Sequence, residues 1–467
     1  MGRNRKNRQQ FYENVELLAA GGEGHALAKI EGKVIFVKYG APGDVVDLKI
    51  VGRKKKFSLA NITKIHQAST DRVEPFCEHY GTCGGCKWQH IDYSVQQQLK
   101  YQWARDCMQR IGKIEIQETL PIVGSMEQQF YRNKMEYTFS NKRWLYDHED
   151  LRELEHTNAL GFHAPGRFDK VLAIDKCWLQ NDVGNQIRNF VFQYCLENEY
   201  TFYDLREHTG LMRNLMLRNT KSGDWMVNVV FAKEEKERIE KLLAATKEQF
   251  NPKALNYCIN TKLNDSIFDQ EFISYSGDYE IQEELCGLRF NISPKSFFQT
   301  NPKQAETLYN VALDFAEISK SDVVYDLYCG TGTITCVAAN SAKNAIGVEI
   351  VEEAIAAAKV NAEINNLDNV KFLAGDMKDV FNPEFYKEHG APDIIITDPP
   401  RSGMHPKVVE YLAEIACPKI VYVSCNPATQ ARDLAMLDEK YKVVKSQAVD
   451  MFPQTHHVEN VVLLELR

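Results

Sequence analysis

Five residues in the C-terminal half are of types that perform covalent and acid–base chemistry. Cys425 lies in Ser-Cys-Asn-Pro after a strand-like run, and a cysteine at the carboxyl end of a strand is a candidate nucleophile. Asp398 precedes two prolines, which must take the chain out of its sheet, so its carboxylate is expected at the same edge. Near the C-terminus, His456, His457 and Glu459 are each conceivable bases. The pattern indicates catalysis at strand ends, with a buried structural cysteine as the alternative for Cys425.

A glycine turn upstream predicts a nucleotide-like cofactor. Gly330 and Gly332 follow a strand-like run, and Glu349 closes the next one, 19 residues after Gly330 (349 − 330). An acidic residue at that distance is placed to bind ribose hydroxyls. The third glycine of the dinucleotide fingerprint is replaced by Thr335, which disfavours NAD and therefore a dinucleotide oxidoreductase. An adenosine ligand without a diphosphate, such as S-adenosylmethionine, fits better.

A cysteine cluster predicts a metal site. Cys77, Cys83 and Cys86 have the spacing C-x5-C-x2-C, and Cys177 lies at the end of a later strand-like run. Zinc sites of four thiolates usually come as paired C-x2-C knuckles, whereas here three thiolates cluster and one stands apart. Zinc and an iron–sulfur cluster both remain open from spacing alone.

Composition predicts a cytoplasmic globular protein with an uneven charge. The 467 residues are 44% apolar, without a secretory signal or an uncharged run long enough to span a membrane. Disulfides are therefore not expected among the 12 cysteines. The net charge is −8, but residues 1–60 carry 12 Lys+Arg against 6 Asp+Glu, or +6, which leaves −14 elsewhere. This basic region, with a basic arm at 1–10 and a basic run at 53–56, suggests a phosphate-rich ligand.

The surrounding elements suggest three regions. Short strands over 15–65 predict an OB-like β-barrel, a frequent nucleic-acid scaffold. A helix over 95–111 is expected to present Leu99, Trp103, Cys107 and Ile111 on one apolar face. Residues 120–290 indicate an α+β region. The last segment alternates strands and helices, which implies α/β architecture: a doubly wound parallel sheet that binds its ligand at the strands' carboxyl ends.

In combination, these motifs resemble the RNA (uracil-C5)-methyltransferase family. The matching segments are Ser296-Phe-Phe-Gln-Thr-Asn301, DLYCGTGT, DPPR, SCNP and the tail from Asp450 to Glu459, in order. The family resemblance implies three domains: a TRAM barrel at 1–66, a central α+β domain at 67–290 with an iron–sulfur site, and a Rossmann-like methyltransferase domain at 291–467. A helix near 93–115 is placed to pack on the catalytic domain. The barrel and the cysteines resemble the 23S ribosomal RNA branch.

The resemblance also implies roles for individual residues. Cys425 would be the nucleophile that adds to C6 of uracil, and Glu459 the general base. The implied cofactor-binding set, for S-adenosylmethionine, is Gln299, Tyr328, Thr333, Glu349, Asp376 and Asp398, of which Gln299 and Asp398 would also hold the uracil edge. Cys77, Cys83, Cys86 and Cys177 would hold a 4Fe–4S cluster. Phe297 or Phe298 would stack on the flipped base or its neighbours.

The resemblance implies 23S ribosomal RNA as the partner, with no membrane and no obligate protein partner. Two other functions stay open. A transfer RNA (uracil-C5)-methyltransferase would share the same motifs, because these residues do not encode the RNA. An RNA-binding iron–sulfur protein without turnover is disfavoured, because Cys425 and Glu459 are both present.

Overall fold

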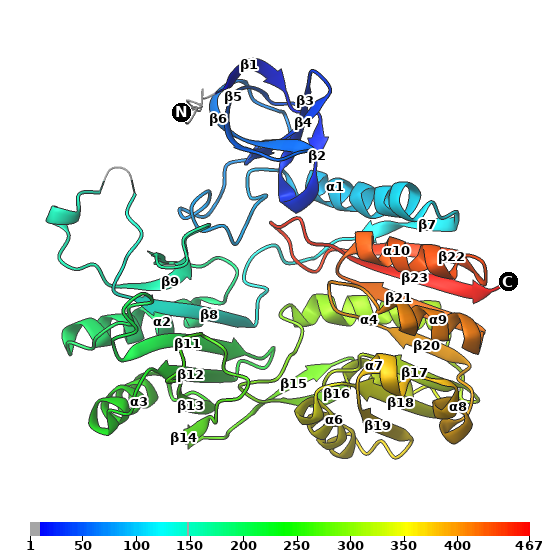
Figure 1. The fold of residues 1–467 in the computed structure, drawn as a ribbon. Coiled ribbons are helices and arrows are strands. Elements are labelled where there is room, and N and C mark those ends of the chain that lie inside the picture. Colours follow the sequence, from blue (N-terminus) through cyan, green and yellow to red (C-terminus); the bar gives the residue numbers. More distant parts are fainter. Residues whose placement is uncertain (1–9, 147–148) are drawn as a thin grey trace, which may run out of the picture. The chain divides into compact units, whose positions relative to one another are not determined.

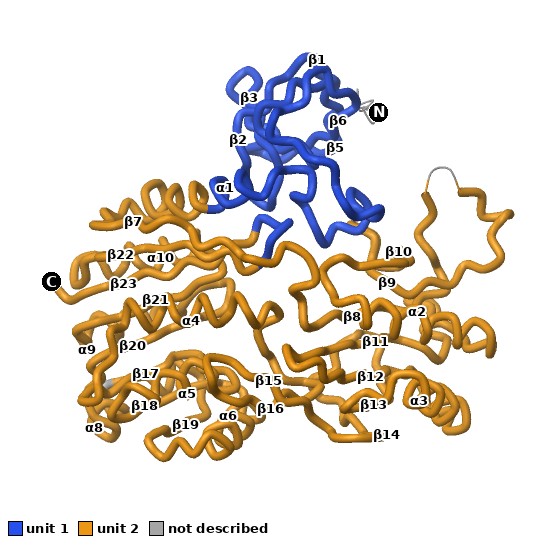
Figure 2. Tube along the Cα trace, turned by 180° about the vertical axis from the view of Figure 1, so that it is seen from behind, with its two compact units in different colours: residues 1–100, 452–456 blue, residues 101–451, 457–467 orange. Residues whose placement is uncertain are grey.

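The computed structural model describes residues 10–146 and 149–467, and this part of the chain divides into two compact units (Figures 1 and 2). Unit 1 takes in the chain up to residue 100 together with 452–456, and unit 2 takes in 101–451 and 457–467. Residues 1–9, which are most of the predicted basic arm, lie outside the described residues.

Unit 1 is built on a six-stranded sheet with the order β1-β5-β6-β4-β3-β2. Its strands are β1 (Phe11–Glu16), β2 (Ala19–Ala20), β3 (Ala26–Ile30), β4 (Lys33–Lys38), β5 (Val45–Arg53) and β6 (Phe57–Gln67), with the short helix η1 (Gly22–Gly24). Neighbouring strands are antiparallel except β4 and β6. Alternate residues such as Ile35, Val37, Val46 and Leu48 form one core, because side chains alternate across a strand. The β-rich N-terminal region is confirmed, and its identity as a TRAM barrel stays a prediction.

Residues 452–456 join unit 1 through main-chain and side-chain hydrogen bonds. The Gln454 carbonyl accepts from the Lys87 and Trp88 N–H groups at 2.9 and 3.0 Å. Gln96 donates its amide to Gln454 Oε1 and accepts from the Gln454 N–H, both at 2.9 Å. A segment near the C-terminus is thus part of the N-terminal unit.

The first part of unit 2 holds a seven-stranded sheet with the order β10-β9-β8-β11-β12-β13-β14. Its elements are β8 (Lys134–Ser140), η3 (Leu151–Glu153), β9 (Ala159–His163), β10 (Val171–Ala173), α2 (Asp182–Glu197), β11 (Met212–Asn219), β12 (Trp225–Phe231), α3 (Lys236–Phe250), β13 (Ala254–Ile259) and β14 (Ile273–Gly277). Only β12 and β13 pair in parallel. This mixture agrees with the α+β character read from the sequence. Cys177 was expected at a strand end, but β10 ends at Ala173, so Cys177 lies in the following loop.

The second part of unit 2 is an eight-stranded sheet with the order β19-β18-β17-β20-β21-β23-β22-β7. Its strands are β7 (Ile116–Val123), β17 (Val323–Leu327), β18 (Asn344–Glu349), β19 (Val370–Ala374), β20 (Ile394–Thr397), β21 (Lys419–Ser424), β22 (Tyr441–Val449) and β23 (Glu459–Leu466). Helices α4 (Pro302–Ala316), α5 (Thr333–Ala339), α6 (Glu352–Ile364), α7 (Met377–Val380), α8 (Pro383–His389), α9 (Pro406–Ile415) and α10 (Pro427–Leu437) connect them, and the hairpin β15 (Ile281–Leu285) and β16 (Leu288–Ile292) precedes α4.

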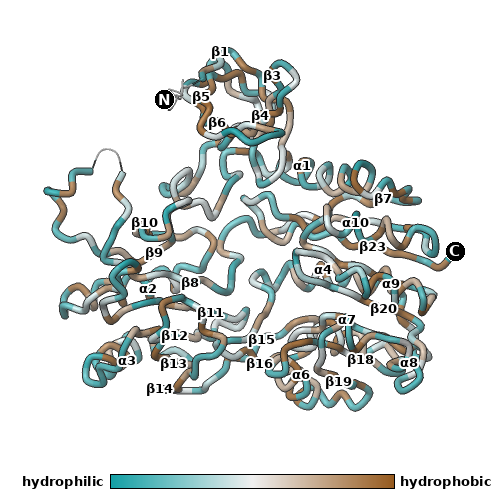
Figure 3. Tube along the Cα trace, viewed as in Figure 1, coloured by the Kyte–Doolittle hydropathy of each residue, from teal (hydrophilic) through white to brown (hydrophobic). Residues whose placement is uncertain are grey.

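This C-terminal sheet confirms a Rossmann-like architecture, with two additions that the sequence did not predict. The five strands from β17 to β21 are parallel to one another. Strand β23 runs antiparallel to both of its neighbours, β21 and β22. Strand β7, which precedes the whole central region in sequence, pairs in parallel with β22. The strands of this sheet are rich in hydrophobic residues (Figure 3), and side chains such as Ile395, Val421 and Val462 are fully buried.

The predicted amphipathic helix forms as α1 (Tyr93–Asp106) and continues as the π-helix η2 (Cys107–Gly112). Cys107 is buried in the core of the C-terminal sheet, as expected for a residue of the apolar face. The same expectation is wrong for Trp103 and Ile111, which are 38% and 50% exposed. The π-turn shifts the phase of the residues that follow it, which turns Ile111 outward. Within the described residues, no helix combines the length and apolar character needed to cross a membrane.

Candidate active site

Two side chains predicted as catalytic, those of Cys425 and Glu459, and the predicted cofactor-binding Asp398 lie at the carboxyl edge of the C-terminal sheet. Asp398 follows β20 and Cys425 follows β21, two parallel neighbours whose carboxyl ends meet at one edge. Glu459 is the first residue of β23, which runs antiparallel to β21 with Asn460 opposite Ser424. Because β23 begins where β21 ends, it brings Glu459 to Cys425.

Burial and mutual repulsion govern the protonation of this group. Burial raises the pKa of the Cys425 thiol to about 11, and the neighbouring carboxylates of Glu459 and Asp398 act in the same direction. Burial also raises the pKa of the Glu459 carboxyl well above its ordinary value, and Asp398 raises it further while Arg401 opposes the shift. The pKa of Asp398 is likewise raised by burial. In the free protein, Cys425 is therefore a thiol at neutral pH.

Arg401 belongs to this site, although no role was predicted for its side chain from the sequence. Its guanidinium lowers the pKa of Cys425 through its charge and a hydrogen bond, against the larger effect of burial. Its main-chain carbonyl accepts from Asn426 Nδ2 at 3.0 Å and from Thr429 Oγ1 at 3.2 Å. The loop after β20 is thus tied to the start of α10. The signal available in the sequence was the position of Arg401 directly after Asp398-Pro-Pro.

The glycine turn between β17 and α5 leaves room for a ligand. Gly330 and Gly332 have φ of 54° and 79°, in the left-handed region that favours glycine. A Cβ at Gly332 would lie 2.8 Å from the Phe372 ring and 2.9 Å from the Ala358 methyl. A Cβ at Gly330 would meet nothing within 4 Å. Gly332 is needed for packing, whereas Gly330 borders open space.

Glu349 fixes this turn through its carboxylate. One oxygen accepts from the Gly330 N–H at 3.1 Å, and the other accepts from the N–H groups of Ile350 and Val351 at 2.9 and 3.1 Å. Glu349 is half-exposed at the end of β18. A carboxylate has about four acceptor positions, so capacity remains for hydroxyl donors such as those of a ribose.

Thr333 and Asp326 connect the turn to a buried polar group. Thr333 Oγ1 lies 3.1 Å from the Tyr309 hydroxyl, and Thr335 Oγ1 donates to Asp326 Oδ2 at 2.6 Å. Burial raises the pKa of Asp326 to about 7. Its second oxygen, Oδ1, is buried with no hydrogen-bond partner among the described residues. A buried carboxylate oxygen without a hydrogen-bond partner, next to an open turn, is consistent with a ligand that donates hydrogen bonds there. Tyr309 and Asp326 were not assigned from the sequence.

The other predicted cofactor residues come from three separate segments. Asp376 caps α7, where it accepts from the Lys378 N–H at 3.3 Å and its Nζ at 2.6 Å, and this pairing lowers the pKa of Asp376. Tyr328 follows β17 with φ 68° and packs against the C-terminal core. Gln299 lies between β16 and α4, where its carbonyl accepts from Asn133 Nδ2 at 3.3 Å. Asp376 and Tyr328 share the edge with the glycine turn, and the roles of all three stay predictions.

Two phenylalanines before α4 differ in their exposure. Phe298 is 3% exposed, and its ring lies against Phe290 with the centroids 6.3 Å apart. Phe297 is 73% exposed. Of these two rings, only that of Phe297 is therefore accessible for stacking. The sequence alone gave no reason to prefer one phenylalanine over the other.

Three of the four predicted metal ligands lie in one loop of unit 1, between β6 and α1. Cys77, Cys83 and Cys86 are each half-buried. The loop is folded on itself, because the Tyr80 N–H donates to the Cys77 carbonyl at 3.0 Å and the Cys83 N–H donates to the His79 carbonyl at 2.9 Å. Three thiols within one compact loop are a suitable donor set for a soft metal.

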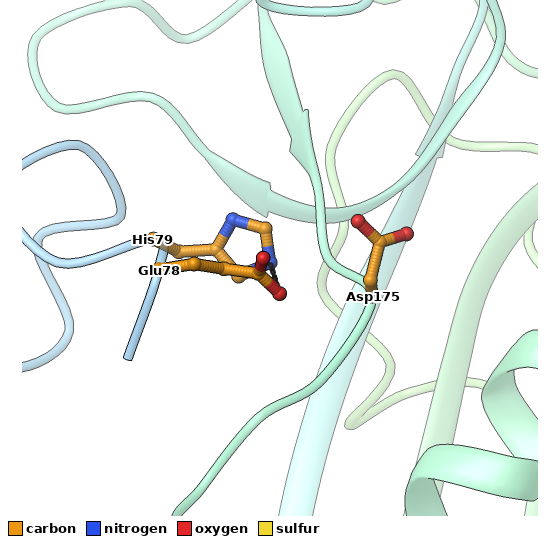
Figure 4. Close-up of side chains that lie close together, drawn as sticks. All are labelled: Glu78, His79 and Asp175. Carbon is orange, nitrogen blue, oxygen red and sulfur yellow. Dashed lines mark ion pairs between the residues drawn. The ribbon is translucent and has the colours of Figure 1, made fainter. Parts of the chain in front are cut away.

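The fourth predicted ligand, Cys177, belongs to unit 2 and is held by α2. Asn185 Oδ1 accepts from the Cys177 N–H at 2.8 Å, and Asn185 Nδ2 donates to the Cys177 carbonyl at 3.1 Å. Figure 4 draws Asp175 of the same segment, and it also shows Glu78 and His79 of the unit 1 loop, whose side chains form an ion pair at 3.8 Å when His79 is protonated. A single site formed by all four cysteines stays a prediction.

Comparison with known proteins gives relatives over nearly the whole chain. Residues 203–467 match the family model described as tRNA (uracil-5-)-methyltransferase. A protein described as an uncharacterized RNA methyltransferase of Bacteroides thetaiotaomicron is 52% identical, covering 95% of this chain and 99% of the relative. A protein with the same description from Porphyromonas gingivalis is 49% identical, covering 96% of this chain and 99% of that protein.

A solved structure shares the fold. The crystal structure of Pyrococcus abyssi tRNA (uracil-54, C5)-methyltransferase in complex with S-adenosyl-L-homocysteine superposes with a TM-score of 0.75 at 28% identity. The match covers 96% of this chain and 100% of that one. The N-terminal β-rich region and the Rossmann-like sheet therefore have a counterpart of known structure.

Proposed function

We propose that this chain, which belongs to the tRNA (uracil-5-)-methyltransferase family, methylates C5 of a uridine in 23S ribosomal RNA. The activity at family level is S-adenosylmethionine-dependent methylation of uracil C5 in RNA. The observation that carries the proposal is the convergence of Cys425, Glu459 and Asp398 at the carboxyl edge of the C-terminal sheet.

The proposed roles follow from the weak nucleophilicity of uracil C5. S-adenosylmethionine, when bound, supplies an electrophilic methyl group. The Cys425 thiolate adds to C6, the displaced electron pair forms an enolate, and C5 then takes the methyl group. Glu459 removes the proton from C5, the C5–C6 double bond re-forms, and the thiolate leaves. Atoms balance, because one C5 proton is exchanged for one methyl group.

The resting thiol must lose its proton before it can attack. The high pKa of Cys425 keeps the thiol form in the free protein, and the Arg401 guanidinium favours the thiolate. Burial raises the pKa of Asp398, so Asp398 is suited to take the thiol proton, which leaves Glu459 free to remove the proton from C5. We assign Arg401 to stabilising the thiolate once the substrate excludes water from the site.

The cofactor site would be formed by the glycine turn and its neighbours. Gly330 borders open space, Glu349 keeps acceptor capacity for the ribose, and Asp326 Oδ1 is a buried acceptor. These features fit an adenosine ligand without a diphosphate. Asp398 and Gln299 would hold the uracil edge or the cofactor, while Tyr328, Thr333 and Asp376 would complete the lining.

The choice of 23S ribosomal RNA rests on the N-terminal half. The four cysteines and the basic β-rich region resemble the ribosomal branch. The second candidate is a transfer RNA uridine, which is favoured by the likeness to the Pyrococcus abyssi enzyme, a tRNA (uracil-54, C5)-methyltransferase. Domain boundaries at 66 and 290 and a cytoplasmic location belong to the same proposal.

The thiols of Cys77, Cys83, Cys86 and Cys177 would hold a 4Fe–4S cluster, which fits a donor set of four soft ligands. The methylation has no redox step, so a structural or RNA-contacting role is proposed for the cluster. Bound zinc is the alternative to be tested.

Nucleoside mass spectrometry would identify the substrate. Ribosomal and transfer RNA would be purified from cells with and without the gene, digested, and analysed for 5-methyluridine. Loss of the modification from 23S RNA alone, restored by the wild-type gene, is the expected result. Loss from transfer RNA would replace the proposed target by the second candidate, and unchanged 5-methyluridine in both RNAs would refute the proposed function.

A further inference from the structure

A loop of the central sheet presents large apolar side chains to solvent. Residues 260–272 join β13 to β14 (Figure 1), and within them Leu263 is 68% exposed and Phe268 is 76% exposed. Isolated exposed apolar residues are common, so exposure alone carries no conclusion. The features that distinguish this loop are its rigid attachment and its neighbours.

A buried arginine fixes one side of the loop. Arg213 is 1% exposed, and its Nη1 donates to the carbonyls of Asn260 and Lys262 at 2.8 and 2.5 Å. Its Nη2 donates to the Asn264 carbonyl at 2.9 Å and to Asp265 Oδ1 at 2.8 Å. Four acceptors on a single guanidinium hold the loop in one conformation before any ligand arrives, which lowers the entropy cost of binding.

The other side of the loop is anchored in an apolar cluster. Phe272 is buried with Met216 and Val230 of the central sheet, and Ile267 packs against the same cluster. Phe268 lies between these two anchors and yet stays in solvent. Its exposure is therefore set by the fold around it.

The loop is linked to the segment that carries the other exposed phenylalanine. Lys295 Nζ donates to the Phe268 carbonyl at 3.1 Å, two residues before Phe297. On the same segment, the Ser296 carbonyl accepts from Arg218, which is buried and has two further nitrogens without a hydrogen-bond partner among the described residues. The main chain of Phe268 is thus linked through Lys295 to the segment that carries Phe297.

One cation, Lys295, lies beside the main chain of Phe268 and outside the ion pairs of the loop. In the loop, Lys262 pairs with Asp269, and Asp265 pairs with Arg213 of β11, whereas the exposed Glu271 has no ion pair among the described residues. Within the described part of the chain, neither Lys295 nor Arg218 forms an ion pair. An exposed aromatic ring beside a cation is the arrangement with which proteins bind unpaired nucleotides.

We propose that Phe268 and Lys295 form a second stacking site for the RNA substrate, which takes one unpaired nucleotide near the one on Phe297. The Phe268 ring would stack on the base, and the Lys295 ammonium would contact the phosphate. The inference rests on the proposed RNA-modifying function and extends it, because it names the substrate as RNA with at least two splayed bases. A protein partner on Phe268 is the alternative outcome of the test.

The test compares Phe268→Ala and Phe268→Tyr with Phe168→Ala, whose ring is 66% exposed elsewhere in unit 2. The probe is a fluorescein-labelled 12-nucleotide oligouridylate. Phe268→Ala should weaken binding by about fivefold or more, the low end for loss of one stacked base, while Phe268→Tyr and Phe168→Ala stay near wild type. Lys295→Gln should reduce the slope of log affinity against log salt by ~0.7.

A direct readout is the fluorescence of Phe268→Trp, which the oligouridylate should quench by stacking. Unchanged affinity of Phe268→Ala together with an unquenched Phe268→Trp would overturn the site, and in that case Phe268 would be left for a protein partner. Wild-type protein that binds S-adenosylmethionine but shows no affinity for the oligouridylate or for ribosomal or transfer RNA would overturn both the site and the proposed function, so the two failures are distinguishable.

Discussion

Cys425 lies near the carboxyl groups of Glu459 and Asp398, whose charges, together with burial, favour its protonated form. As a consequence, the Cys425 thiol should react slowly with electrophiles other than the substrate, since the thiolate is the reactive species. Arg401 partly compensates by favouring the thiolate. At the residue scale, burial keeps the proposed nucleophile as a thiol, and Asp398 is its proposed proton acceptor.

We expect Cys425→Ala to abolish methyl transfer while S-adenosylmethionine binding stays within a few fold of wild type. The C6 adduct cannot form without the thiol, whereas the cofactor residues lie in other loops. Calorimetry would measure cofactor binding, and RNA containing 5-fluorouridine should trap the wild type covalently. Substantial turnover by Cys425→Ala would show that another group is the nucleophile. Cys417→Ala, a buried cysteine at the other end of β21, is the matched control.

Glu459→Gln should allow methylation but stall release. Without a base for the C5 proton, the thiolate cannot be expelled, so a covalent RNA–protein adduct should accumulate on denaturing gels. Removal of a general base typically slows turnover by ~10²–10⁴-fold. Normal turnover without an adduct would transfer the role of base to His456 or His457.

The same substitution should change the pH dependence of stability. The folded state raises the pKa of Glu459, so its contribution is present below the ordinary carboxyl pKa and is lost as the pH rises through the raised value. Glutamine cannot ionise, and Glu459→Gln should therefore gain roughly 1 kcal/mol or more over wild type between pH 5 and pH 9. Urea unfolding at both pH values measures this. Glu465→Gln, at a partly buried position on β23 that pairs with Lys442, should show no such gain.

At the element scale, local patterns predicted most of the strands, whereas their pairing was not predictable. The C-terminal strands and their glycine turn carry strong local signals. The antiparallel run of β23 does not, because it depends on a partner strand and no residue of β23 encodes its direction. Strand β7 pairs with β22 across more than 300 residues of sequence, which local periodicity cannot report.

The candidate site was predictable where a motif ends a strand. Cys425, Asp398 and Glu349 all follow or close strands, so their shared edge could be inferred. Arg401 and Asp326 act through charge and burial, which depend on the folded surroundings. Phe297 and Phe298 are adjacent and identical in type, so only packing could show that one is buried and the other exposed.

The cysteine loop and the α2 segment should together carry an iron–sulfur cluster. Protein purified without oxygen should be brown and contain about four iron atoms per chain. Cys177→Ser should lose iron and stability, because a thiolate ligand is removed. Cys195→Ser, at a buried position in α2, serves as the control and should keep its iron. Stoichiometric zinc without visible absorbance would contradict the cluster.

At the scale of the whole molecule, charge is divided unevenly along the chain. The first 60 residues carry +6 and the remainder −14. Arg53 at the end of β5 and Lys54, Lys55 and Lys56 in the following turn bring four exposed basic side chains together. Since most of the chain repels a phosphate backbone, RNA affinity should depend on this turn more than the net charge of −8 suggests.

Replacing residues 54–56 by glutamine should weaken RNA binding and leave S-adenosylmethionine binding unchanged. Each lost phosphate contact should flatten the slope of log affinity against log salt by ~0.7–0.9. The control replaces three exposed lysines of unit 2, Lys233, Lys236 and Lys241, so that the net charge falls equally. If the turn variant and the control have the same slope of log affinity against log salt, the basic turn serves only solubility. A flatter slope in the turn variant alone would place RNA phosphates on unit 1.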